Sequence, residues 1–279
     1  MSRLVREQAQ RAWAAGSRAV IVHVIQVAGS VPRGVGTRML VEAQGPITGT
    51  IGGGRLEWEA IAAAREMAAQ TPSGPEEVRE LDFPLGPRLG QCCGGRVRLQ
   101  LTRLGPSALQ DWPEPALRFT LHLWGAGHVG QAIVQALHGI EARVRWLDER
   151  EEAWADFQVP ASPSTVQVER VWSEPLESEV ASARSGDFHL VLTHRHDLDL
   201  RICLALCQRN DFGFLGLIGS ATKRARFEHQ LLERAIARAT LDRMVCPIGL
   251  PGIAGKEPAV IAASVVAQLL SESAPPESR

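Results

Sequence analysis

The sequence predicts an α/β protein in which a smaller N-terminal α+β domain precedes a Rossmann-like domain with a doubly wound parallel sheet. Strand-like and helical segments alternate from residue 119 onward, and a glycine-rich turn joins the first of these strands to its helix. Strands at hairpin spacing dominate the part before residue 105. The 279 residues suffice for two domains of about 100–150 residues each.

The N-terminal domain is expected to span residues 1–104. It opens with an amphipathic helix, after which an apolar, β-branched strand and its hairpin partner flank a turn-rich segment. Apolar residues then recur at helical spacing behind a glycine triplet, and an alternating segment closes the domain. The expected helices are 3–15 and 56–67, and the expected strands are 19–27, 39–42, 48–51 and 97–102.

A linker is predicted at residues 105–117, where GPSALQDWPEPA carries three prolines and a glycine. The Rossmann-like domain then spans 118–270, and Pro258 suits the first turn of its final helix. The segment SESAPPESR, residues 271–279, is expected to be a disordered tail. The expected strands of this domain are 119–125, 144–147, 165–168, 188–192 and 212–218, with helices at 131–137, after Asp197 and after Ser220.

Composition excludes several classes of protein. The net charge of −1 carries no bulk electrostatic signature of nucleic-acid or membrane binding. The five cysteines lack CxxC spacing, which argues against a disulfide framework or a structural zinc site. Neither an apolar signal segment nor an apolar run of about 20 residues is present, so a cytoplasmic protein with reduced thiols is expected.

The segment GAGHVG, residues 125–130, is the main candidate binding motif. Gly125 permits a tight turn, Gly127 lets a pyrophosphate approach the backbone, and Gly130 lets the helix pack on the strand. The helix that begins near His128 offers N–H groups to an anion, and Asp148 closes the next strand. The motif therefore predicts a dinucleotide-sized phosphate ligand without specifying hydride transfer. The alternative is a degenerate turn that binds nothing.

Two further glycine-rich segments are candidate anion sites. The triplet of Gly52, Gly53 and Gly54 precedes a helix and could form a nest of N–H groups, or a tight turn packed against its own domain. Arg33 lies within the loop at 29–36 and could bind a phosphate with two hydrogen bonds. An exposed hairpin loop without a ligand is the alternative for Arg33.

The QCCGGR segment, residues 91–96, is the main thiol candidate. A cysteine beside glycines and an arginine can be stabilised as the thiolate, the form that ligates a metal or carries sulfur. Cys92 and Cys93 are adjacent, so at most one is expected to act, and Gly94 follows them. A buried structural cysteine is the alternative.

Polar residues follow two later strands, at the edge where doubly wound sheets bind ligands. His194 and His196 could ligate a metal, but no third ligand is near in sequence, so they are expected to form a polar rim of a cleft. Asp197 is expected to cap the helix that follows, while Cys203 and Cys207 are expected in the core. Ser220 is the expected cap of the next helix, where Lys223, Arg224 and Arg226 indicate an anionic partner or a solvated basic face.

Together these segments resemble the XdhC/CoxI family of xanthine dehydrogenase accessory proteins. The similar stretches lie in order across nearly the whole chain, which makes chance agreement improbable. They are GSVPRGVGTRM (29–39), GTIGGGRLE (49–57), QCCGG (91–95), GAGHVG (125–130), LDER (147–150), THRHDLDL (193–200), GLIGSATKRARF (216–227) and CPIGLPGIAGKEP (246–258).

The resemblance implies a maturation factor and not an enzyme. Such a protein binds molybdenum cofactor, in the molybdopterin form or a nucleotide-extended one, supports exchange of an oxo ligand for sulfur, and inserts the product into xanthine dehydrogenase of purine catabolism. The implied partners are the molybdenum-binding subunit of xanthine dehydrogenase and a cysteine desulfurase, and a homodimer is a further expectation. Cys93, the favoured thiol, would be a transient molybdenum ligand. The expected cofactor-binding residues are Cys93, Cys92, Gly94, Arg33, Gly52, Gly53, Gly54, Gly125, Gly127, His128, Gly130, Asp148, His194, Ser220 and Lys223.

The chain departs from the family pattern in its final helix. Ala259, Val260 and Gln268 stand where acidic residues are common in the family, so no acid-dependent role is expected there.

Two other functions stay open. One is an NAD(P)-dependent oxidoreductase that uses the GAGHVG site, with His194 or His196 as the proton donor. The other is a nucleotide-sensing regulator that carries no cofactor, in which a separate dinucleotide would occupy the Rossmann-like site.

Overall fold

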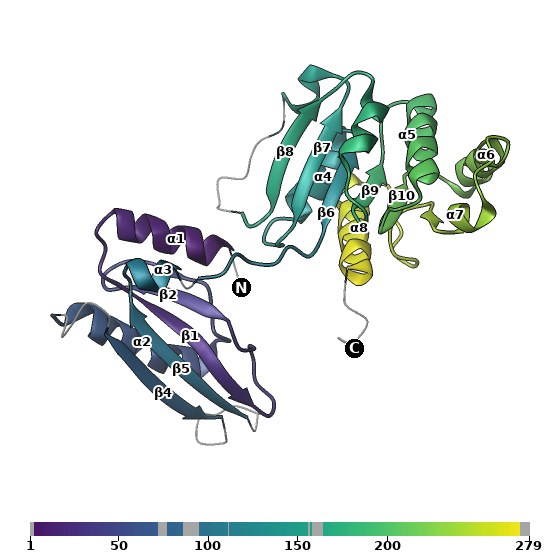
Figure 1. The fold of residues 1–279 in the computed structure, drawn as a ribbon. Coiled ribbons are helices and arrows are strands. Elements are labelled where there is room, and N and C mark those ends of the chain that lie inside the picture. The colour runs from purple at the N-terminus through teal and green to yellow at the C-terminus, as the bar shows by residue number, and fades with distance from the viewer. Residues whose placement is uncertain are drawn as a thin grey trace. The chain divides into compact units, whose positions relative to one another are not determined.

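The structure of the protein, a computed structural model, describes residues 3–71, 77–85, 95–110, 112–155, 157 and 164–273. The chain divides into two compact units, which we name unit 1 (Met1–Ala116) and unit 2 (Leu117–Arg279) (Figure 1). Among the residues described, no helix has both the length and the apolar composition that crossing a membrane requires.

Unit 1 is built on a five-stranded antiparallel sheet with the strand order β3-β2-β1-β5-β4. Side chains alternate between the two faces of β1, so this strand contributes to two cores. Val20, Val22 and Val24 pack with Leu56 and Ala60 of α2, whereas Ile21 faces α1. The elements are α1 (Arg3–Ala14), β1 (Ala19–Ala28), β2 (Arg38–Glu42), β3 (Ile47–Thr48), α2 (Gly54–Ala69), β4 (Val78–Pro84), β5 (Arg96–Arg103) and α3 (Pro106–Gln110).

Unit 2 contains a six-stranded parallel sheet with the order β11-β10-β9-β6-β7-β8. The chain first moves outward from β6 through β7 to β8, and then returns to β9 on the other side of β6. The elements are β6 (Thr120–Trp124), α4 (His128–Ala136), β7 (Arg143–Asp148), η2 (Glu151–Trp154), β8 (Gln167–Trp172), η3 (Leu176–Ser182), β9 (Phe188–Val191), α5 (His196–Arg209), β10 (Phe214–Leu217), α6 (Ala221–Leu232), α7 (Arg238–Asp242), β11 (Met244–Val245) and α8 (Pro258–Glu272).

Both faces of this parallel sheet are covered. On one face α4 and α8 pack together over the strands, with Ile133 and Leu269 in the same apolar cluster. On the other face α5 and α6 contribute Ile202 and Phe227 to a second cluster. Helices on both sides of a parallel sheet confirm the predicted Rossmann-like fold class, and the antiparallel sheet of unit 1 agrees with an α+β N-terminal part.

The structure also differs from the sequence predictions at several elements. The strand β4, the short helix α7 and the short strand β11 were not expected. Arg195 occupies the cap position of α5, so the prediction that Asp197 caps this helix is wrong, whereas Ser220 caps α6 by accepting a hydrogen bond from the Lys223 N–H. Cys203 and Cys207 are buried, as expected.

The segments predicted as linker and tail contain regular structure. Residues 106–110 of the expected linker form α3, and Trp112, which is 1% exposed, packs in one cluster with α1 and β1. At the other end, α8 continues to Glu272, two residues into the expected tail, and residues 274–279 lie outside the described residues.

Candidate functional site

The GAGHVG turn joins β6 to α4 at the carboxyl edge of the unit 2 sheet. Gly125 has φ +118°, and an added Cβ would lie 2.4 Å from the Leu192 carbonyl oxygen. An added Cβ at Gly130 would lie 2.4 Å from the carbonyl oxygen of Gly125. Gly127 has φ −73°, and nothing lies within 4 Å of its would-be Cβ. The first and third glycines are therefore required by the fold, whereas the second lies open to an incoming group.

Asp148 lies at the end of β7, and its side chain is 2% exposed. Its Oδ2 accepts hydrogen bonds from the Ala126 N–H at 2.7 Å and from Arg150 Nη2 at 2.9 Å. Its Oδ1 accepts from the Arg150 N–H at 3.0 Å and from Arg150 Nε at 2.9 Å. Although burial opposes the charged form, the hydrogen bonds from Arg150 and Ala126 outweigh it and lower the pKa of Asp148. Both carboxylate oxygens are thus engaged within the protein.

A pocket of about 310 Å³ opens beside this turn, at the ends of β9 and β10. It adjoins the glycine turn because the would-be Cβ of Gly125 lies 3.0 Å from the Thr193 Cα, and Thr193 lines the pocket. The lining residues are Thr193, His194, Arg195, His196, Asp199, Ile218, Gly219, Ser220 and Lys223.

Asp199 holds the two walls of this pocket together. Its Oδ1 accepts hydrogen bonds from the N–H of Thr193 at 3.0 Å and from its hydroxyl at 2.7 Å. Its Oδ2 accepts from Lys223 Nζ at 2.7 Å, and the same ammonium donates to the Ile218 carbonyl at 2.8 Å. The two charged side chains are 2% and 10% exposed. Lys223 is therefore part of a buried ion pair that positions the loops.

Glu149 connects β7 to the loop after β9. Its Oε1 lies 3.6 Å from His194 Nε2 and 3.3 Å from Arg195 Nη1. The predicted residues of unit 2 therefore gather along one edge of the sheet, around the ends of four neighbouring strands. They are Gly125, Gly127, His128, Gly130, Asp148, His194, Ser220 and Lys223.

The glycine triplet of unit 1 forms a turn closed by its own helix. The Glu57 carboxylate accepts hydrogen bonds from the N–H groups of Ile51 at 3.0 Å and Gly53 at 3.1 Å, and from the Thr50 hydroxyl. The N–H of Gly52 donates to the Thr50 hydroxyl at 3.1 Å. These donors of the expected anion nest are satisfied within the chain.

Three motifs that are far apart in the sequence meet at the loop of residues 29–36. An added Cβ at Gly52 would lie 2.5 Å from Pro32 and 3.7 Å from Arg33, and one at Gly95 would lie 2.3 Å from the Ser30 carbonyl oxygen. Arg33 is exposed on this loop. Cys92, Cys93 and Gly94, just before Gly95, lie outside the described residues. Within the residues described, no group of three or more His, Cys, Asp or Glu side chains is placed to hold a metal ion.

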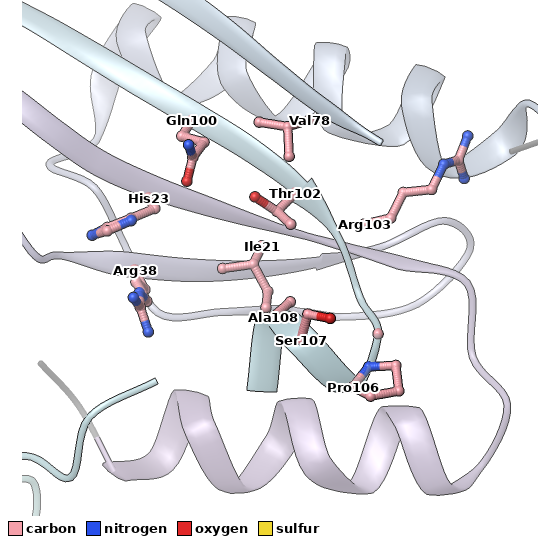
Figure 2. A pocket seen from close by; sticks show the side chains of 11 residues that line it. Ile21, His23, Arg38, Val78, Gln100, Thr102, Arg103, Pro106, Ser107 and Ala108 are labelled. Carbon is pink, nitrogen blue, oxygen red and sulfur yellow. The ribbon is translucent and has the colours of Figure 1, made fainter. Parts of the chain in front are cut away.

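Unit 1 also contains a pocket of about 250 Å³ between its sheet and α3, shown in Figure 2. Side chains from β1 and β5, including Ile21, His23 and Gln100, line it together with Ser107 of α3. Burial and the neighbouring Arg38 lower the pKa of His23 from 6.5 to about 4, so this imidazole is neutral. None of the residues predicted to bind a cofactor lines this pocket.

Sequence reasoning missed Glu149, Arg150, Trp172 and Asp199 as parts of the carboxyl edge. Glu149 and Arg150 lie in the LDER segment and Asp199 in the THRHDLDL segment, so a signal was present. The side chains and backbone groups that these three residues contact, however, depend on which strands are neighbours in the sheet. Trp172 gave no signal, because a lone tryptophan at a strand end is usually a core residue.

Comparison with known proteins places these features in a family. A family model described as the XdhC Rossmann domain matches residues 121–269, and one described as the XdhC and CoxI family matches residues 12–80. The uncharacterized protein YqeB of Escherichia coli (strain K12) is 30% identical over 256 residues, covering 90% of this chain and 42% of that protein. The chain thus spans less than half the length of this relative.

A crystal structure from Bacillus halodurans, described as that of a xanthine dehydrogenase, has a similar fold. Its TM-score is 0.73 at 19% identity, and the match covers 100% of this chain and 98% of that one. Because the Rossmann-domain model alone spans more than half of the sequence, this chain belongs to the XdhC and CoxI family.

Proposed function

We propose that the protein is a carrier that binds molybdenum cofactor, holds it during sulfuration and inserts it into xanthine dehydrogenase. One observation carries this proposal. At the carboxyl edge of unit 2, the turn around Gly127 is open to an incoming group, and it adjoins a pocket of about 310 Å³. Such an edge binds phosphorylated ligands in doubly wound folds.

The chemistry of this edge suits an anionic cargo with a terminal phosphate. Gly127 caps α4 and His128 begins it, so the first N–H groups of this helix can bind an anion, and Gly127 leaves room for close approach. His194 and Arg195 line the adjacent pocket and can donate hydrogen bonds to polar groups of a pterin or phosphate. The Asp199–Lys223 pair keeps these donors in place.

The proposed thiol belongs to the QCCGGR segment. Cys93 is two residues from Gly95, which lies against the loop that carries the exposed Arg33. We propose that Cys93, or else Cys92, is the thiol that acts in sulfur exchange, and that Arg33 binds an acidic group. The molybdenum-binding subunit of the target and a cysteine desulfurase are the proposed partners. A carrier of this kind needs only modest affinity, since very slow release would impede transfer.

The geometry at Asp148 argues against the dehydrogenase alternative. In dinucleotide-dependent dehydrogenases an acid at this strand end binds the ribose hydroxyls. Here both Asp148 oxygens are occupied by Ala126 and Arg150, so the carboxylate would have to give up these partners to bind a ribose.

Anaerobic equilibrium binding of purified molybdenum cofactor tests the proposal. The wild type is expected to bind one equivalent at micromolar affinity, and binding is expected to collapse in Cys93→Ala. The matched variant Cys92→Ala identifies the acting thiol if the loss occurs there. Undetectable binding by the folded wild-type protein would remove the carrier proposal.

Gly127→Ala tests the role of the glycine turn. An added methyl group meets no protein atom within 4 Å, so the melting temperature should stay unchanged, whereas cofactor affinity should fall about tenfold as the methyl blocks the phosphate. Gly105→Ala is the matched control, because its Cβ also meets nothing within 4 Å. Unchanged cofactor affinity in Gly127→Ala would place the cargo elsewhere.

A further inference from the structure

Trp172 is an exposed aromatic side chain at the carboxyl edge of the unit 2 sheet. It is the last residue of β8, and 56% of it is exposed. Its indole N–H donates a hydrogen bond to the Glu149 carbonyl oxygen at 3.1 Å, which fixes the ring beside the end of β7. Single exposed aromatic side chains are common on protein surfaces, and Trp172 differs in that a hydrogen bond fixes its ring at the ligand-binding edge of the sheet.

Arg150 presents a second planar group beside it. Asp148, the residue directly opposite Trp172 in the β7–β8 pair, binds the guanidinium through Nε and Nη2, both at 2.9 Å. The Arg150 side chain is nevertheless 37% exposed. The plane of the Arg150 guanidinium is therefore held in a fixed orientation, while part of the side chain stays exposed to solvent. Arginine planes and aromatic rings are the two groups on which proteins stack the bases of nucleotides.

The position of these two groups follows from the strand order. β7 lies next to β6, which carries the glycine turn, and β8 lies next to β7. A ligand whose phosphates lie on the turn at Gly127 can extend along the same edge, over the ends of β7 and β8. The pocket lined by His194 and Lys223 lies in the other direction, at the ends of β9 and β10.

We propose that Trp172 and Arg150 form a base-recognition surface, which binds the planar heterocycle of a nucleotide whose diphosphate lies on the glycine turn. The ligand class is a nucleoside diphosphate, free or as part of a dinucleotide. This inference goes beyond cofactor carriage, because it assigns a nucleotide to unit 2. That nucleotide is either an extension of the cargo itself or a ligand that competes with the cargo's phosphate for the turn at Gly127.

Calorimetric titration of the full chain with ADP and with inorganic pyrophosphate tests this surface. The wild type should bind ADP about tenfold or more tightly than pyrophosphate, the range that stacking of one base contributes. Trp172→Ala should remove this difference by weakening ADP binding alone, and Trp172→Phe should restore most of it. Arg150→Gln should weaken ADP binding in the same way.

Two control variants separate recognition from general effects. Trp58→Ala removes a tryptophan that is 70% exposed in unit 1, and Arg143→Gln removes an arginine at the opposite end of β7; both should bind ADP like the wild type. Equal affinities for ADP and pyrophosphate in the wild type would overturn the proposal, as would no binding of either. ADP affinity that is unchanged in Trp172→Ala would also overturn it.

Titration with CDP and with NAD⁺ distinguishes the sources of the base. Preference for CDP over ADP points to a pyrimidine nucleotide, and preference for NAD⁺ points to a complete dinucleotide; both support the surface. Because these titrations contain no molybdenum, their failure is distinguishable from failure of the carrier proposal.

Discussion

Asp199 is the residue whose removal should most disturb the edge of unit 2. Its carboxylate is almost fully buried and satisfies both Thr193 and Lys223. Asp199→Ala leaves the Lys223 ammonium buried without its partner, which should lower the free energy of unfolding by about 3–5 kcal/mol. Urea denaturation measures this.

The double variant Asp199→Leu with Lys223→Met provides the comparison. It removes both charges and fills the space with apolar groups, so it should be clearly more stable than Asp199→Ala. A loss below about 1 kcal/mol in the single variant would contradict the role assigned to this pair.

At the scale of elements, the start of α2 depends on one side chain. Glu57 accepts the N–H groups of Ile51 and Gly53, so it closes the turn that leads from β3 into the helix. Glu57→Ala leaves these donors without their acceptor and should destabilise unit 1 by about 1–3 kcal/mol, measured by thermal unfolding.

Glu59→Ala is the matched control on the same helix. Glu59 pairs with Arg55, whose side chain is 58% exposed, so its removal should change stability by about 0.5 kcal/mol or less. Equal losses in the two variants would show that the turn does not depend on Glu57.

The elements that the sequence predicted share strong local periodicity. β1 is apolar and β-branched, and the glycine turn lies between β6 and α4 with the order that a Rossmann fold requires. The strand β4 was missed because it is an edge strand with an exposed face, where Arg79, Glu80 and Asp82 interrupt any apolar alternation. Its pairing with β5 is a tertiary effect that no local pattern encodes.

The candidate site was predictable to a similar extent. The glycines, Asp148, His194 and Ser220 each follow a strand, and parallel strands bring such positions to one edge. The hydrogen bonds from Arg150 to Asp148 and from the Trp172 indole to the Glu149 carbonyl were not predictable. Hydrogen bonds of this kind depend on side-chain rotamers and on which strands are neighbours.

At the scale of the whole molecule, two histidines in the core of unit 2 make its stability depend on pH. Burial lowers the pKa of His189 from 6.5 to about 3, and it also lowers the pKa of His122 despite the nearby Asp187. His189 accepts a hydrogen bond from the Trp124 indole, so it is held in its neutral form.

The sign of the pH effect follows from these shifts. Above pH 6.5 both histidines are neutral whether the chain is folded or unfolded. Below it the unfolded chain takes up these protons more readily than the folded chain, so stability falls by up to about 1.4 kcal/mol per pH unit for each histidine. Urea unfolding between pH 7 and pH 5 should show this loss, and His189→Gln should reduce its slope by up to about 1.4 kcal/mol per pH unit. A slope that the variant leaves unchanged would rule out His189 as a source.

The packing of α8 on α4 has a consequence for the order in which unit 2 is completed during synthesis. Ile133 and Val134 of α4 share an apolar cluster with Val265 and Leu269 of α8, although these helices are separated by most of unit 2 in the sequence. During translation, the glycine turn and α4 leave the ribosome well before the helix that covers them. In a nascent chain α4 therefore lacks this apolar partner, and the helix that follows the glycine turn gains its full packing only after α8 has been synthesised and has docked.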